Sequence, residues 1–348
     1  MVGSFLNVCI HRMPLGESIV SPPSHCPHCK YSIPFYLNIP LVTWLYLRGK
    51  CANCRAPISS RYFLVELLTG VVFLAAWLAF GPTSALLALA YCVILAGFIA
   101  ATFIDFAHFI IPDEITLGGI VVGFLCSLAV PALHGVSDRA AALRYSMIGI
   151  AIGGGVIYGI LRLGKLLFGR QKFVLEPNSR LIFTESALLL PDREIPYEDI
   201  FYRKSDKIKI TASEVEMIDR CYRNVPVSLT QTVLTVGDDI FKPETIPHLE
   251  VVTSELTIPR EAMGLGDVKF MAAIGAFIGG AGVFFALMLS AIIGSIVGVG
   301  AIIIGRKEWS SRIPYGPYIA VAATIWLFLP SAFQIEWQNY LLFFPQIF

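Results

Sequence analysis

Apolar segments long enough to cross a lipid bilayer recur along this chain and constrain its fold more than any other feature. Roughly 20 predominantly apolar residues span the hydrocarbon core of a bilayer. The candidate spans are 63–80, 85–104, 115–131, 146–168, 268–283, 284–304 and 318–333. The sequence therefore predicts an all-α polytopic membrane protein with about seven transmembrane helices.

The composition agrees with a membrane protein. Of the 348 residues, 56% are hydrophobic and only 15% are charged, whereas about a quarter of a soluble domain is charged. The net charge is +1 and no basic tract is present, so the sequence does not predict nucleic-acid binding. The opening "MVGSFLNVCIHRMP" has no basic region before a short apolar piece, which argues against a cleavable signal peptide.

Most of the charged residues lie in one block, between Arg170 and Glu261. This block contains alternating stretches such as "DKIKIT" and "SRLIFTESALLL", which predict a mostly β soluble insertion. We therefore divide the chain into four parts. They are a Cys-rich N-terminal domain (1–62), transmembrane helices (63–169), the insertion (170–258) and further transmembrane helices (259–348).

Basic residues in the short loops predict the orientation, because Lys and Arg concentrate on the cytoplasmic side. The N-terminal part and the loop at 305–317 are both rich in them. With seven spans, these two regions, the turn at 105–114 and the insertion are all cytoplasmic. Asp105 ends the second span and Asp267 opens the fifth, so both are predicted at the same membrane boundary, where they can meet.

The acidic residues lie in two motifs, "FIDFAHFIIPDEIT" with Asp105 and Asp113, and "GLGDVKF" with Asp267. Two carboxylates held close share a proton, so one activates a water while the other polarises a carbonyl, as in aspartic peptidases. Alternatively, Asp105 and Asp267 merely end and cap helices at the interface. A proton-coupled transporter would also use such acids, although no internal repeat is present, and a zinc-stabilised membrane scaffold would not need them.

Other residues near these motifs have two interpretations each. Gly264 and Gly266 give the backbone conformational freedom and let another chain approach. Lys269 either stabilises nearby charge or extends to the membrane surface as an interfacial lysine. Glu66 lies about one turn inside a span, where an ionisable residue is a functional candidate, or else it pairs with Arg61.

Four cysteines form two pairs, "CPHC" with Cys26 and Cys29, and "CANC" with Cys51 and Cys54, separated by 21 residues. Paired CxxC elements at about this spacing predict a structural zinc site with four thiolate ligands. Disulfides or redox dithiols are the alternatives, against which the predicted cytoplasmic position argues.

Together these motifs, with "GSFLNVCIHRMP" and "IPYGPYIA", resemble the prepilin peptidases, or type IV leader peptidases, which are membrane aspartic proteases of the GxGD type. The resemblance covers nearly all of the chain outside 170–258, in the family's order. It implies that Asp105 and Asp267 are catalytic. Asp113, the competitor for the first role, and Gly264, Gly266 and Lys269 would support them.

The resemblance also implies the substrate and the location. A prepilin or pseudopilin with a short basic leader and an apolar helix would be cut after a glycine, at the cytoplasmic face of the bacterial inner membrane. Pilus or secretion machinery would be a further partner. Bifunctional members then methylate the new amino terminus with S-adenosylmethionine, and Gly49 is a candidate for that activity or, alternatively, a turn glycine before the second Cys pair.

Two features depart from the family. Met1 stands only two residues before Gly3, so most of the first family helix is expected to be truncated. The insertion of 170–258 replaces a loop that is usually short. It either contacts the substrate leader or an assembly-ATPase-side partner, or it is passive.

Overall fold

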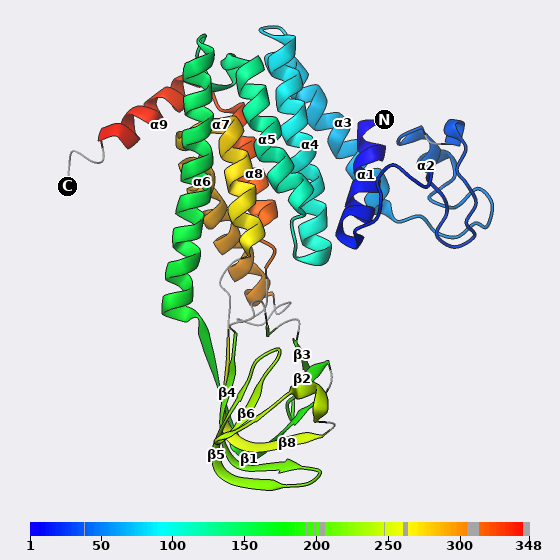
Figure 1. Ribbon diagram of the computed structural model, residues 1–348. Coiled ribbons are helices and arrows are strands. Elements are labelled where there is room, and N and C mark those ends of the chain that lie inside the picture. Colours follow the sequence, from blue (N-terminus) through cyan, green and yellow to red (C-terminus); the bar gives the residue numbers. More distant parts are fainter. Residues whose placement is uncertain are drawn as a thin grey trace. The chain divides into compact units, whose positions relative to one another are not determined.

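The computed structural model places the helices and the strands in separate parts of the chain. One compact unit comprises Met1–Tyr158 and Gly264–Phe348, and a second comprises Gly159–Met263 (Figure 1). The structure describes residues 1–343 except 38, 185, 193, 198–199, 202–205, 247, 260–263 and 305–312. Three basic residues used to predict the orientation lie outside the described residues, namely Arg306, Lys307 and Arg312.

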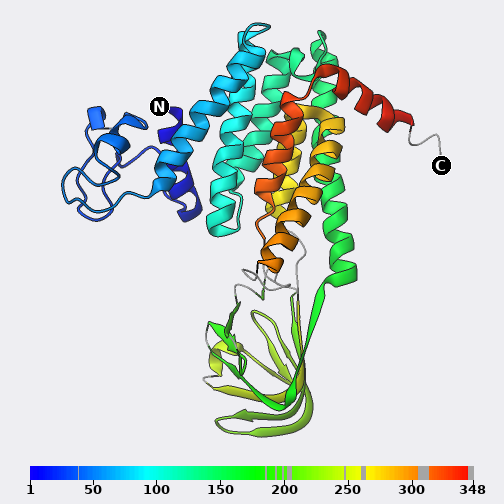
Figure 2. The same cartoon turned by 180° about the vertical axis from the view of Figure 1, so that it is seen from behind.

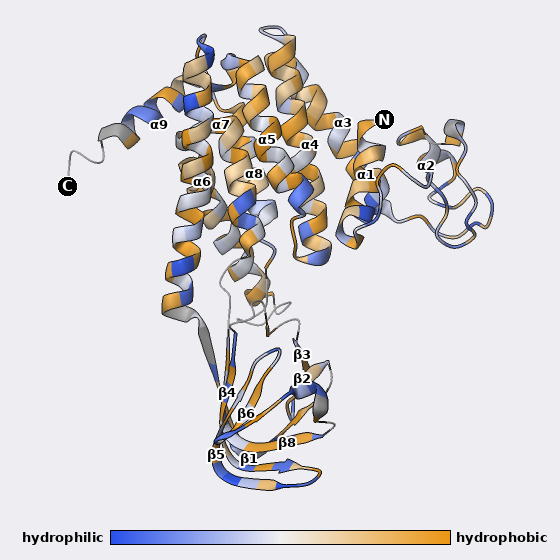
Figure 3. Cartoon of the chain, viewed as in Figure 1, coloured by the Kyte–Doolittle hydropathy of each residue, from blue (hydrophilic) through white to orange (hydrophobic). Residues whose placement is uncertain are grey.

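Within the described chain, four helices are long and apolar enough to cross a membrane. They are α3 (Ser60–Phe80), α4 (Ala85–His108), α6 (Arg139–Phe168) and α7 (Leu265–Ile303). Helices α8 (Gly316–Phe328) and α9 (Ser331–Phe343) make a fifth span if they count as one, bent by 113°. Helix α5 (Asp113–Ala129) matches a predicted span but has only 17 residues. The helices are predominantly hydrophobic along their length (Figure 3). The total of seven transmembrane helices stays a prediction.

Helix α7 is broken at Gly279, whose φ of 68° and ψ of 178° are not helical. Asp267, before the break, interacts electrostatically with Tyr315, and Ser290, after the break, hydrogen-bonds to the same tyrosine. Along a straight helix Asp267 and Ser290 would be about 35 Å apart. The chain therefore reverses at Gly279, five residues before the predicted junction of spans 268–283 and 284–304.

The short N-terminal helix α1 (Val2–Arg12) packs against α3 and α4 (Figure 2). Leu6 and Ile10 share an apolar cluster with Val65 of α3 and Ile104 of α4. A Cβ on Gly3 would lie 2.8 Å from the Cα of Glu66, so the two backbones meet too closely for a side chain. Between α1 and α3 lie the cysteine loops, with η1 (Met13–Leu15), η2 (Phe35–Leu37) and α2 (Val42–Tyr46).

Glycines also let α6 approach the first part of α7. A Cβ on Gly149 would overlap the carbonyl of Gly275, and a Cβ on Gly153 would overlap the carbonyl of Met271. Small residues at helix contacts are typical of membrane bundles, where packing rather than burial from water drives association. After α5 the chain forms η3 (Pro131–His134), where His134 bonds Ser127 Oγ (2.9 Å), which also donates to the carbonyl of Ala276 near the break in α7.

The second unit is one antiparallel sheet of eight strands in the order β3-β2-β1-β8-β4-β5-β6-β7. The strands are β1 (Arg170–Phe183), β2 (Ala187–Leu189), β3 (Glu194–Pro196), β4 (Ile208–Met217), β5 (Cys221–Leu229), β6 (Leu234–Val236), β7 (Asp239–Phe241) and β8 (Leu249–Pro259). A 3-10 turn, η5 (Pro243–Thr245), precedes β8. The prediction of a mostly β insertion is confirmed.

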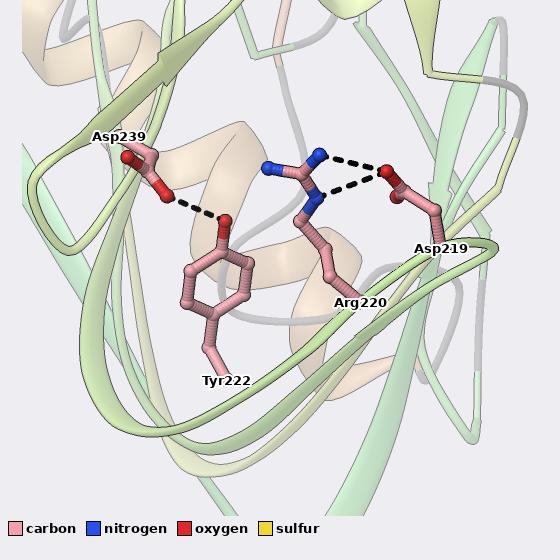
Figure 4. Close-up of polar contacts among 4 residues, drawn as sticks. All are labelled: Asp219, Arg220, Tyr222 and Asp239. Carbon is pink, nitrogen blue, oxygen red and sulfur yellow. Dashed lines mark hydrogen bonds and ion pairs between the residues drawn. The ribbon is translucent and has the colours of Figure 1, made fainter.

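Alternation in the sequence explains this sheet. In β4 the side chains from Ile208 to Ser213 alternate between buried and exposed, and after an irregularity at Glu214 the alternation resumes from Val215. The buried side chains join a core made wholly of residues between Leu181 and Ile258. The first and last strands pair along their length, with Arg170 opposite Pro259. On the exposed surface, Tyr222 Oη donates to Asp239 (2.6 Å) and Arg220 forms an ion pair with Asp219 (Figure 4).

Candidate active site and cysteine cluster

Asp105 lies in the last turn of α4 and is buried, with 5% of its surface exposed. Its Oδ2 accepts a hydrogen bond of 2.9 Å from the backbone N–H of Gly316, the first residue of α8. The first N–H groups of a helix have no partner inside the helix and carry partial positive charge. The start of α8 therefore holds this carboxylate in place.

Asp267 lies in the first turn of α7, as the motif predicts. Its carboxylate accepts the backbone N–H of Gly264, the residue that precedes the helix. A third-position side chain that reaches back in this way satisfies one of the unpaired N–H groups of the first turn. The carboxylate therefore has a fixed position at the end of its helix.

The fold brings Asp105 and Asp267 close enough to interact electrostatically, although 161 residues separate them in the sequence. Tyr315, just before α8, adds a hydroxyl that bonds Ser290 Oγ at 2.9 Å. Burial raises the pKa of Tyr315, and the negative charge of Asp267 acts in the same direction. The hydroxyl therefore stays protonated beside the carboxylates.

Asp113 and Lys269 form an ion pair of 2.6 Å between the start of α5 and the first turns of α7. Both side chains are substantially exposed, at 58% and 38%. Lys269 thus contacts Asp113, the alternative candidate for the first catalytic role. Asp113 is much more exposed than Asp105. The pair joins the two acidic motifs on their outer side.

The two glycines of the "GLGD" motif do not use the conformational freedom expected of them. Gly264 has φ −75° and ψ 151°, and Gly266 belongs to α7, so both backbones are accessible to other residues. Gly266 instead faces the backbone of Ile111, where an added Cβ would lie 3.5 Å from the amide nitrogen. Of the two roles expected for these glycines, the structure retains only the approach of another chain segment, since Gly266 lies against the 105–114 turn.

An apolar pocket of about 250 Å³ adjoins the residue after Asp105, and sequence reasoning missed it. It is lined by Phe106, Phe109, Val297, Ala301, Ile313, Pro314 and Tyr318. Sites for small-molecule ligands usually measure about 300–1,000 Å³, so this pocket suits a single large side chain. The one hint of it in the sequence is the motif "IPYGPYIA", which supplies three of these residues.

The four cysteines of the two CxxC pairs lie together, with all sulfur atoms within 4.8 Å of one another. Cys26 and Cys54 are 3.8 Å apart, and Cys29 and Cys51 are 4.0 Å apart. Zinc–sulfur bonds of about 2.3 Å in a tetrahedron put sulfurs about 3.8 Å apart, so this donor set fits a zinc ion. The cysteines are free thiols rather than disulfides.

Each pair sits in a similar turn. The N–H of Lys30 bonds the carbonyl of Cys26, and the N–H of Arg55 bonds that of Cys51, with both donor residues in the left-handed region at φ 56° and 60°. The backbone N–H of Tyr31 is the main cause that lowers the pKa of Cys29 to about 6. A thiolate, the form that binds zinc, is therefore favoured at that position.

Gly49 and Glu66 lie near this cluster. Gly49 has φ 65°, and a Cβ there would lie 2.9 Å from the ring of Trp44, so the position requires glycine for the turn. Glu66 Oε2 accepts a hydrogen bond of 2.8 Å from the backbone N–H of Leu41. This backbone contact, rather than an ion pair with Arg61, is the interaction that the structure gives this carboxylate.

These features define a class, that of polytopic membrane proteins with a pair of juxtaposed aspartates and a cluster of four cysteines. Family models identify it further. Residues 1–80 match the bacterial Peptidase A24 N-terminal domain, and residues 92–171 match the type IV leader peptidase family. The chain belongs to the type IV leader peptidase family. Asp105 lies inside the second match, whereas Asp267 lies beyond both.

Curated relatives agree with this assignment. A protein of Aeromonas hydrophila is 28% identical over 93% of this chain and 86% of its own length. Two further relatives match over shorter segments. A protein of Myxococcus xanthus is 45% identical over 44% of this chain and 42% of its own length. A protein of Dichelobacter nodosus is 36% identical over 49% of this chain and 66% of its own length. All three are named prepilin leader peptidase/N-methyltransferase. No solved structure matches the chain.

Proposed function

We propose that this chain is an aspartic endopeptidase that removes the leader of type IV prepilins or pseudopilins and then methylates the new amino terminus. The observation that carries the proposal is the meeting of Asp105 and Asp267 beside the first N–H of α8. The names of the relatives support the reaction class. The arrangement of the two acids supplies the chemistry.

The two carboxylates act as a unit. Because they lie close together, they hold one proton between them. The ionised carboxylate takes a proton from a water molecule, which attacks the scissile carbonyl, while the protonated carboxyl donates a hydrogen bond to the carbonyl oxygen. The N–H of Gly316 keeps Asp105 oriented throughout, and the ion pair of Asp113 with Lys269 fixes the neighbouring loop.

The apolar pocket beside Phe106 would bind a substrate side chain next to the scissile bond. A substrate with a basic leader and an apolar helix fits this arrangement, because its helix can lie among apolar spans while the bond reaches the acids at their ends. The basic residues of the N-terminal part support an orientation in which the acids face the cytoplasm. The bacterial relatives support a location in the bacterial inner membrane. Machinery that assembles pili or secretes proteins would then receive the mature product.

The cysteine cluster would hold a structural Zn²⁺ through Cys26, Cys29, Cys51 and Cys54, which leaves no open coordination position for chemistry. S-adenosylmethionine would supply an electrophilic methyl group for the second reaction. Gly49 would shape the turn before Cys51 rather than contact the methyl donor, because its conformation and the nearby Trp44 ring already account for a glycine.

A cleavage assay tests the proposed peptidase. We expect Asp105→Asn and Asp267→Asn each to lower kcat for a purified prepilin precursor by about 10²–10⁴-fold, the usual contribution of general acid–base catalysis. N-terminal sequencing of the product would locate the cut after the leader glycine. The protein should be assayed in lipid nanodiscs, because both acids lie at the ends of helices that are candidate membrane spans.

Two further variants make the assay specific. Glu336→Gln removes an exposed acid of α9 and should cleave like the parent. Asp113→Asn breaks the ion pair with Lys269 and should retain substantial activity. Undiminished cleavage by Asp105→Asn and Asp267→Asn, or loss confined to Asp113→Asn, would refute the two-aspartate assignment.

A further inference from the structure

Ser290 is a buried hydroxyl in the second half of α7 that the proposed mechanism does not use. It is 0% exposed. Its Oγ donates to the carbonyl of Leu287 (2.9 Å) and lies 2.9 Å from the hydroxyl oxygen of Tyr315. A serine hydroxyl has a single hydrogen to donate, and the Leu287 carbonyl accepts it. The Tyr315 hydroxyl is therefore the donor in the second bond, and Ser290 fixes its position.

The reversal at Gly279 brings Ser290 back to the end of α7 that carries Asp267. Asp267 lies 12 positions before Gly279, and Ser290 lies 11 positions after it. At about 1.5 Å per residue, both lie about 16–18 Å from the break. Both also reach Tyr315, Asp267 through an electrostatic interaction and Ser290 through the hydrogen bond. The two halves of α7 therefore contact one and the same tyrosine side chain.

Small residues on the returning half of α7 make room for the segment that leads into α8. Ser290, Gly294 and Gly298 are spaced by four residues and so lie on one face of the helix. A Cβ on Gly294 would lie 3.6 Å from the ring of Tyr315, and a Cβ on Gly298 would lie 3.1 Å from Cδ1 of Ile313. A large side chain at either glycine would displace the segment. The face that carries Ser290 therefore sets how closely this segment approaches α7.

The same segment reaches both carboxylates through consecutive residues. The N–H of Gly316 donates to Oδ2 of Asp105 (2.9 Å), and Tyr315, the preceding residue, interacts electrostatically with Asp267. The backbone joins these two groups, so a displacement of the tyrosine also displaces the N–H. Two carboxylates share a proton only while they stay close together. The position of Tyr315 therefore affects both acids at once.

We propose that Ser290 is a positioning residue for peptide cleavage, which acts through Tyr315 to keep Asp105 and Asp267 correctly placed. The inference rests on the peptidase half of the proposed function. Neither Ser290 nor Tyr315 belongs to the lining of the apolar pocket beside Phe106, so loss of their bond affects the chemical step rather than substrate binding. A misplacement of about 1 Å can slow an enzyme by about 100-fold, so one hydrogen bond is enough for a measurable effect.

The kinetics of precursor cleavage in nanodiscs test this assignment. We expect Ser290→Ala and Tyr315→Phe each to lower kcat about ten-fold while KM changes by less than about two-fold. The double variant should lose no more than Tyr315→Phe alone, because both substitutions remove the same hydrogen bond. The melting temperature of each variant should stay within about 4 °C of the parent's, the usual effect of losing one such bond.

Two controls match these substitutions. Thr324→Val removes a hydroxyl that donates to the carbonyl of Ala320 within α8 itself. Tyr340→Phe removes the hydroxyl of a tyrosine that is 58% exposed in α9. Both variants should cleave like the parent. Tyr315→Phe keeps its ring and should fold, so its kinetics test the assignment even where Ser290→Ala lowers stability.

The outcomes separate this inference from the proposed function. If Asp105→Asn and Asp267→Asn abolish cleavage but Ser290→Ala and Tyr315→Phe retain the parental kcat, the inference is wrong and the proposed function stands. A loss that appears in KM, that follows unfolding, or that multiplies in the double variant also overturns it. If the parent does not cleave precursor, the proposed function fails and this inference fails with it. A lower kcat in folded variants, with parental KM and no further loss in the double variant, supports it.

Discussion

Gly316 is the residue on which the position of Asp105 depends most directly. Its N–H donates to Asp105 Oδ2, and a Cβ at this position would lie 2.8 Å from that oxygen and 3.0 Å from Ile111 Cδ1. Side-chain ends can shift at small cost to the fold. The atom that would shift, however, is the carboxylate oxygen assigned to catalysis, so the requirement for glycine here concerns activity more than stability.

We therefore expect Gly316→Ala to lower kcat/KM for precursor cleavage by at least about ten-fold, with little change in the melting temperature. A ten-fold loss corresponds to about 1.4 kcal/mol of transition-state stabilisation. Gly118→Ala in α5 is the matched control, because an added Cβ there meets no atom within 4 Å. Equal activity of the two variants, or unfolding of Gly316→Ala, would contradict this role.

The sequence predicted the candidate acids better than the groups that hold them in position. Counting the predicted spans placed Asp105 and Asp267 at the same membrane boundary, and the structure brings the two carboxylates close enough to interact electrostatically. The role of Gly316 depends on how α8 packs against α4, which no local pattern encodes. The motif "IPYGPYIA" marked the segment as part of a family without indicating that its glycine N–H meets an aspartate.

Among the elements, the two cysteine turns illustrate what spacing alone can predict. Each CxxC turn is closed by local backbone bonds, so a short sequence determines its shape. The meeting of the two turns was predictable because a tetrahedral ion needs four ligands. By contrast, the hydropathy of 268–304 predicted two spans but placed their junction a few residues after the break at Gly279. The long apolar run contains several glycines, and only Gly279 adopts the left-handed region.

We expect the purified protein to contain about one zinc ion per chain, and Cys29→Ser to lose most of it. Removing a ligand should lower the melting temperature of the N-terminal part by at least about 5 °C, since structural zinc contributes directly to folding. Metal analysis and a thermal unfolding assay measure both effects. Cys221→Ser, an exposed cysteine of the sheet, should change neither. A metal-free parent with unchanged stability would contradict a structural zinc site.

At the scale of the whole molecule, the sheet is an insertion with a core of its own. All its buried core residues lie between Leu181 and Ile258, and its first and last strands pair with Arg170 opposite Pro259. Alternation predicted the strands, but their order could not be predicted, because β1 pairs with β8 across most of the insertion and such distant pairing leaves no local signal.

Opposite residues of paired strands have Cα atoms about 4.5–5.5 Å apart, so a short Gly-Ser linker can replace 171–258. We expect the shortened protein to cleave precursor with a kcat/KM within about two-fold of the parent, because the buried core cluster of the sheet consists of residues of the insertion itself. Zinc content and helical circular dichroism would verify its folding. A loss above ten-fold in a folded protein would instead assign the insertion a contact with the leader or a partner.

The reversal at Gly279 has a consequence for the depth at which the first part of α7 can end. The part of α7 that begins with Asp267's turn runs only from Leu265 to Ile278, which is about 21 Å at about 1.5 Å per residue. The hydrocarbon core of a bilayer is about 30 Å thick. Residues 270–278 are buried inside the helical unit, so protein rather than lipid surrounds this short helix, and the bilayer does not have to match its length. The helix can therefore end below the membrane surface, with the carboxylate of its first turn kept within the protein.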